Sequence, residues 1–143
     1  MAQNYKSHVR YVPLYHIVLY VLLLLCLITS SWNLFRALSF HSGRLVAVSL
    51  VGLVLIGAIL AWYSRVFALK AQDRAIRAEE NIRHLALTGK LLDKRLHLSQ
   101  IIALRFANDE EFLTLATKAA EEGMKASDIK QAIRDWKADY HRV

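Results

Sequence analysis

Two long apolar runs lie in the N-terminal half of the chain, and they constrain its fold more than any other feature. Residues 12–34 contain no acidic or basic side chain except His16, and residues 45–63, "LVAVSLVGLVLIGAILAWY", contain none at all. A helix needs about 20 apolar residues to cross the hydrocarbon of a bilayer, and each run is that long. The sequence therefore predicts two membrane spans, at about residues 12–34 and 45–63, joined as a hairpin.

The first run also has some features of a secretory signal, because Lys6 and Arg10 precede it. Against this interpretation, its apolar part is long, an Ala-x-Ala cleavage pattern is missing, and a second apolar run follows. We therefore expect an uncleaved first span.

The formal charge of +7 raises the question of a nucleic-acid partner. Residues 1–64 contain four basic side chains and no acidic one, whereas residues 65–143 contain 15 basic and 12 acidic ones. Nucleic-acid binding needs basic groups clustered on one soluble face, so this near balance argues against it. The charge instead orients the spans, since basic residues favour the cytoplasmic side, where they also lie near membrane lipid. We expect both termini in the cytoplasm, with juxtamembrane basic residues Arg65, Lys70, Arg74 and Arg77.

The second apolar run is followed by a charged stretch with no helix-breaking residue before Gly89. The sequence therefore predicts one helix over residues 45–88, about 66 Å long at 1.5 Å per residue. Opposite charges at helical spacing would support its exposed surface, among them Glu79 with Arg83. This divides the chain into a tail and transmembrane hairpin (residues 1–64) and a cytoplasmic helical region (residues 65–143).

Small residues recur along this long helix at alternating spacings of four and three. This 3.5-residue period is typical of a left-handed coiled-coil seam, and small side chains let helix backbones approach closely. We call this set the small-residue seam: Gly57, Ala61, Ser64, Ala68, Ala71, Ala75, Ala78, Ile82 and Leu85.

The seam allows two interpretations. It could join the long helices of two copies, or bind another membrane protein. Alternatively, alanine is simply a good helix former, and the chain's own C-terminal helices could cover the cytoplasmic part of the seam. These alternatives stay open from the sequence alone.

Three shorter helices are expected after a linker that contains "KLLDKRLHL". Ser99 is a candidate cap for the first, Asn108 and Glu111 resemble a capping box that opens the second, and Gly123 would end it. Ser127 is a candidate cap for the third, whose apolar positions fall at helical spacing: Ile129, Ala132, Ile133, Trp136 and Tyr140. The predicted fold class is all-α.

The residues show no assembled reactive site. His16 lies near the border of the first span, where it can reach water, and the Glu80 and His84 pair lacks the further ligands of a metal site. We therefore expect no enzyme activity and no cofactor. One further binding surface is a basic patch around the linker, formed by Lys90, Lys94, Arg95, His97 and Arg105.

Four stretches carry a resemblance to a known family: "AQNYKSHVRYVPLYH", "FALKAQDRAIRAEENIRH", "GKLLDKRLHLSQIIALRFANDEEF" and "IKQAIRDWKADYHRV". There the chain resembles an uncharacterised family of small bacterial membrane proteins, classified as a domain of unknown function. The resemblance implies an inner-membrane location and assigns no activity. Together these observations predict a non-catalytic interaction or scaffold protein of the inner membrane, which binds a second copy or a membrane-protein partner. The alternative is an accessory subunit of a transporter or respiratory complex.

Overall fold

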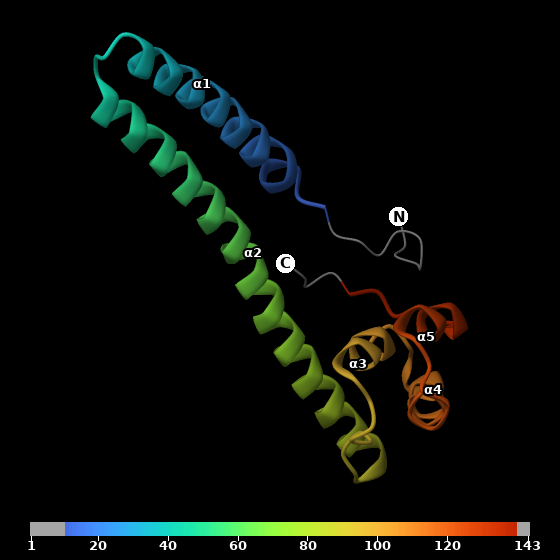
Figure 1. Cartoon of the computed structure of the whole chain (residues 1–143). Coiled ribbons are helices and arrows are strands. Elements are labelled where there is room, and N and C mark those ends of the chain that lie inside the picture. The colour runs from blue at the N-terminus through green and yellow to red at the C-terminus, as the bar shows by residue number, and fades with distance from the viewer. Residues whose placement is uncertain (1–10, 140–143) are drawn as a thin grey trace. The chain divides into compact units, whose positions relative to one another are not determined.

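The computed structural model describes residues 11–139, and they form an all-helical chain (Figure 1). The chain divides into two units. One is a helical hairpin, Tyr11–Phe67, and the other is a C-terminal bundle whose described part covers residues 68–139. The predicted all-α class is confirmed. The N-terminal tail and Tyr140 lie outside the described residues.

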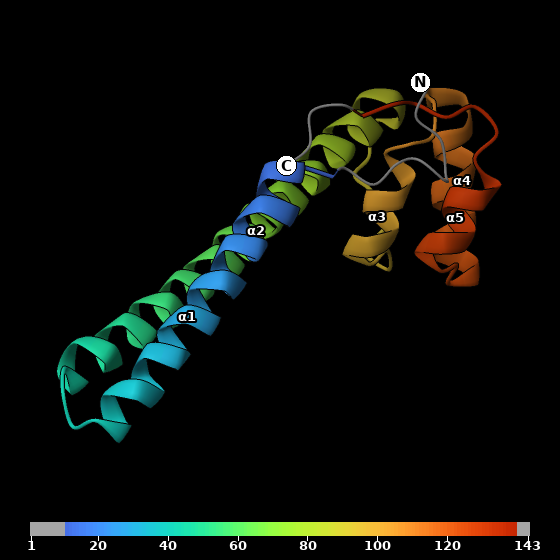
Figure 2. The same cartoon turned by 90° about the horizontal axis from the view of Figure 1, so that it is seen from above.

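The hairpin begins with a short π-helix, η1 (Leu14–Leu19), which continues into α1 (Tyr20–Ser39). A turn that includes Gly43, with φ of +68°, leads into α2 (Arg44–Thr88). Within the hairpin, α1 and the first part of α2 lie side by side in both views (Figures 1 and 2). The first apolar helix therefore continues to residue 39, five residues beyond the predicted end.

Small residues occupy the buried positions of the hairpin, and large apolar ones point outward. Ser30, Ala37, Ala47 and Ala61 are buried, whereas only 6% of the most apolar window of either helix is buried. Such exposure is the opposite of what a core helix of a water-soluble domain shows. Both helices are long and apolar enough to cross a membrane.

Helix α2 runs from Arg44 to Thr88 without interruption, one residue longer than predicted. It ends where the sequence indicated, because Gly89 adopts a φ of +73° and its N–H donates to the Leu85 carbonyl at 2.8 Å. Glycine reaches this left-handed conformation at little cost, which makes it the usual residue after a helix.

Three short helices follow: α3 (Leu98–Leu104), α4 (Asp109–Glu122) and α5 (Ala126–Ala132). Their apolar faces meet in one core, in which Leu104, Phe112 and Ile129 are fully buried. Leu92 and Leu96 add the linker to this core. The linker is therefore part of the folded bundle.

The predicted helix ends were right for α4 and wrong at the starts of α3 and α5. Asn108 caps α4 by accepting a hydrogen bond from the Glu111 N–H at 2.9 Å, and Gly123 ends it with φ of +63°. Helix α3 instead begins after His97, whose N–H donates to the Gln100 side chain at 2.6 Å. Helix α5 begins after Lys125, so Ser99 and Ser127 both lie inside the first turn.

The last helix is much shorter than its apolar spacing predicted. It ends at Ala132, and the chain then turns back along the segment that follows α3. The Glu111 carboxylate accepts hydrogen bonds from the N–H groups of Arg134 at 3.0 Å and Asp135 at 3.4 Å. These N–H groups would otherwise continue a helix, so the contact with α4 favours an extended chain over helix propagation.

Residues 133–139, which we call the C-terminal strap, are fixed against the end of α3. Trp136 forms an isolated antiparallel bridge with Ala107, and its ring stacks on Phe106 with centroids 4.5 Å apart. The Lys137 N–H donates to the Phe106 carbonyl at 2.8 Å. Trp136 thus covers Phe106 from the strap and not from a helical stripe.

The strap should loosen when Glu111 loses its carboxylate. We expect Glu111→Ala to speed tryptic cleavage after Arg134 and Lys137 by about tenfold, because charge-assisted bonds to two backbone N–H groups are lost. Limited proteolysis followed by mass spectrometry measures this. Glu110→Ala, an exposed neighbour in the same helical turn, is the control. Equal cleavage of both variants would contradict this account of the strap.

Candidate interaction site

Arg83 connects α2 to the rest of the bundle. Its Nε donates to Asp109 at 2.7 Å, its Nη2 donates to the Ala107 carbonyl at 2.8 Å, and its Nη1 pairs with Glu80 at 3.1 Å. The guanidinium also lies over the Phe112 ring, 4.3 Å from its centroid. Only 12% of the Arg83 side chain is exposed. The planar, multivalent guanidinium suits such a buried junction, whereas a lysine could not make all these contacts.

Glu80 and Ile76 lie on the same side of α2 and are both buried. Burial raises the pKa of the Glu80 carboxyl above its usual range, and the nearby Arg83 guanidinium opposes this by favouring the charged form. Together with Arg83 they form the docking face of α2, the side on which the bundle packs.

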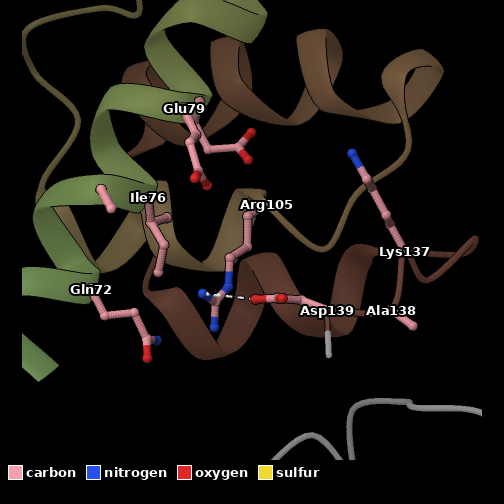
Figure 3. Close-up of a pocket in the computed structure, with 9 residues that line it drawn as sticks. Gln72, Ile76, Glu79, Arg105, Lys137, Ala138 and Asp139 are labelled. Atoms are coloured by element: carbon pink, nitrogen blue, oxygen red, sulfur yellow. Dashed lines mark ion pairs between the residues drawn. The ribbon is translucent and has the colours of Figure 1, made fainter. Parts of the chain in front are cut away.

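An open groove of about 560 Å³ borders the docking face (Figure 3). One wall comes from α2, the other from the C-terminal strap, and Arg105 lies between them, where it pairs with Asp139 at 3.1 Å. Arg105 is buried, so it does not belong to the exposed basic patch predicted around the linker. The lining residues are Gln72, Ala75, Ile76, Glu79, Glu80, Arg105, Lys137, Ala138 and Asp139.

Charged side chains of both signs line the groove. Among the described residues, its lining combines three carboxylates with two cationic side chains. Glu79 and Lys137 are exposed at its walls, which gives the groove groups of both signs. Such a surface suits contact with a charged polypeptide segment.

The first three seam residues belong to the hairpin. A Cβ on Gly57 would lie 3.6 Å from the Leu23 side chain, and the Ala61 carbonyl accepts a hydrogen bond from the Tyr15 hydroxyl. Ser64 is exposed and donates back to the Ala61 carbonyl at 2.9 Å. At Gly57 and Ala61 the seam therefore faces α1 and η1 of the same chain.

The remaining seam residues lie in the C-terminal unit, where Ala68 is half-buried and the following five are exposed. Ile82 is 66% exposed and Leu85 44%. The short helices pack on the docking face, so they do not cover the seam, and the alternative that they do is wrong. We call this open part the exposed seam: Ala71, Ala75, Ala78, Ile82 and Leu85.

The basic residues predicted to lie beside the membrane are mostly exposed as well. Lys70, Arg74 and Arg77 are exposed, and Arg65, in the hairpin unit, is half-buried. The expected ion pair between Glu79 and Arg83 is wrong, because Arg83 turns to Glu80 and Asp109. Within residues 11–139, neither Arg74 nor Glu79 takes part in an ion pair.

Glu80 and His84, which share a helix spacing compatible with metal binding, make different contacts in the structure. Glu80 pairs with Arg83, while His84 Nδ1 lies 2.7 Å from the Lys90 carbonyl. In the linker, the pKa of Asp93 falls to about 2, because the side chain and backbone N–H of Arg95 donate to its carboxylate. Arg95, expected in an open basic patch, is thus neutralised locally.

Sequence reasoning missed the roles of Arg83 and Asp109. The Arg83 interactions cross 24 to 26 residues, and local spacing gives no sign of them. The sequence predicted only that Asp109, in the first turn of α4, complements the helix dipole. In the structure Asp109 also pairs with Arg83.

Comparison with known proteins assigns a family and no activity. The model of a "Family of unknown function (DUF6526)" matches residues 1–143. This match confirms the resemblance to an uncharacterised family. The curated proteins and the solved structures contain no match to this chain.

Removal of the Arg83 side chain should detach α2 from the bundle. We expect Arg83→Met to destabilise the bundle by about 3 kcal/mol, because Glu80 would be left buried without its cation. Hydrogen exchange of the α3 and α4 amides measures this. Arg77→Met, on an exposed position of the same helix, is the control. Addition of Glu80→Gln to Arg83→Met should recover part of the loss, and no recovery would contradict this cause.

Glu80 should also make the bundle less stable as pH rises. Its pKa is raised on folding, so the folded chain holds the proton more tightly, and the stabilisation present below the unfolded pKa is lost as pH rises through the folded pKa. We expect the melting temperature of wild type relative to Glu80→Gln to fall as pH rises above the usual pKa of a glutamate carboxyl. Glu79→Gln gives the baseline for removing one carboxylate. If the melting temperature of wild type relative to Glu80→Gln instead rose with pH, the pKa of Glu80 would be lowered on folding, which would contradict this prediction.

Proposed function

The chain belongs to the DUF6526 family of unknown function, and from that premise we propose that it is a membrane-anchored, non-catalytic association protein. In this proposal, the hairpin spans the inner membrane of a bacterium with both termini in the cytoplasm, and the C-terminal unit binds a protein partner through α2. The single observation that carries the proposal is the exposed seam, an apolar side of a folded helix that its own bundle leaves open.

The membrane part of the proposal rests on the surface of the hairpin. Apolar side chains point outward along both helices, and Trp32, Trp62 and Tyr63 are exposed near the ends of the apolar runs. Aromatic rings of this kind favour the level of the lipid headgroups. The basic residues after the second run support a cytoplasmic C-terminal unit and contact with anionic lipid.

The association part rests on the three sides of α2 in the C-terminal unit. The docking face is occupied by the bundle through Ile76, Glu80 and Arg83. A second side presents basic residues to solvent, and the third is the exposed seam. An apolar helix side beside a folded bundle is typical of helix-to-helix binding.

The groove supports a second candidate function, that of an accessory subunit in a larger membrane complex. Its walls present carboxylates and cationic groups that a charged segment of a foreign subunit could pair with. This function would require co-purifying proteins in fixed stoichiometry.

The test is the mass of the full chain in nanodiscs, with co-purifying proteins identified in the same sample. We expect Ala78→Glu to weaken association about tenfold, because a buried charge at the interface is costly. Ala132→Glu, an exposed alanine on α5, should have no effect. A wild-type chain that is monomeric and alone would overturn the proposed function, and equal effects of the two variants would remove the seam from it.

A further inference from the structure

We propose that the exposed seam binds a second copy of this chain, parallel and in register, and that Arg74 of each copy pairs with Glu79 of the other. This inference rests on the proposed function and commits it to one partner. The observation behind this inference is the set of charged residues beside the exposed seam. The observation behind the proposed function is the exposure of the seam itself.

The exposed seam has the alternating positions of a two-stranded coiled coil. Ala75 and Ile82 form one series, and Ala71, Ala78 and Leu85 form the other, with spacings of four and three between them. The alanines allow close approach of the two helices. Ile82 and Leu85, the largest members and both exposed, supply apolar area at the end of the helix.

Charged residues occupy the positions that flank such a seam. Arg74 directly precedes Ala75, and Glu79 directly follows Ala78. In a parallel coiled coil, the residue before the first core position faces the partner residue five positions further along, and such pairs set partner choice and orientation. Arg74 therefore faces Glu79 of the second copy, and the twofold axis repeats the pair on the other side.

Both side chains are available for this pairing. Arg74 and Glu79 are exposed, and within residues 11–139 neither forms an ion pair. Arg83, four residues further along α2, is instead held by Glu80 and Asp109. Glu79 lines the groove, in which Lys137 is another cationic side chain.

The orientation also follows from the proposed membrane hairpin. Two copies inserted in the same direction place their α2 helices parallel, as the Arg74 to Glu79 pairing requires. In an antiparallel pair, flanking positions of the same kind face one another, so this charge complementarity would be lost. The charges and the proposed insertion thus favour the same arrangement.

Cysteine crosslinking in membranes tests the register. In a Cys26→Ser background, which leaves the chain without cysteine, Ala78→Cys should form a disulfide with the same residue of the second copy. Arg77→Cys, the adjacent position on the basic side, should crosslink at least about tenfold less, because its Cβ points away from the partner. Equal crosslinking at both positions would overturn the proposed register.

Charge reversal tests the pairing. In the Ala78→Cys background, Arg74→Glu should reduce crosslinking about fivefold, since two attractive pairs become repulsive. Arg74→Glu together with Glu79→Arg should restore it. Arg77→Glu makes the same change in charge on the basic side and should leave crosslinking unchanged. Failure of the double variant to restore crosslinking would overturn the Arg74 to Glu79 pairing.

The outcomes separate this inference from the proposed function. If Ala78→Cys captures a foreign protein in fixed stoichiometry and no second copy, the self-association is wrong and the proposed function holds. If the chain is monomeric and no protein binds the seam, both are wrong.

Discussion

The arrangement of the C-terminal unit depends on the guanidinium of Arg83, of whose side chain only 12% is exposed. It joins α2 at once to the turn before α4, to the first residue of α4 and to the ring of Phe112. These contacts decide which side of α2 the bundle covers. Glu80 is buried beside Arg83. Without the Arg83 cation, burial of the charged Glu80 carboxylate would destabilise the folded unit.

The position of this junction determines what the remaining sides of α2 can do. Had the short helices packed on the alanines, the small residues would have served the internal packing of the bundle. The bundle instead uses a side that contains Ile76, Glu80 and Arg83, two of them charged, and leaves alanine, isoleucine and leucine in solvent. The bundle thus pairs Glu80 with Arg83 internally and leaves apolar side chains of α2 exposed, which supports the proposed association.

Those parts of the fold that depend on local chemistry were predictable from the sequence. The apolar runs, the long helix, the glycines that end α2 and α4, and the Asn108 cap all follow from properties of a few adjacent residues. The end of α5 was not, because it depends on Glu111, which lies more than 20 residues earlier and binds backbone N–H groups of the strap. The exposed seam was visible as a pattern, but only the position of Arg83 in three dimensions shows that the bundle leaves it open.

The C-terminal strap has a consequence for the order in which the chain becomes structured. Trp136 and Lys137 complete the environment of Phe106, so the contacts of this ring are complete only after those residues have left the ribosome. Synthesis proceeds from the N-terminus, and the apolar helices of the hairpin emerge long before that point. In the proposed membrane arrangement, insertion of the hairpin therefore does not have to compete with a finished bundle, and each copy reaches the bilayer before its α2 surface is fully formed.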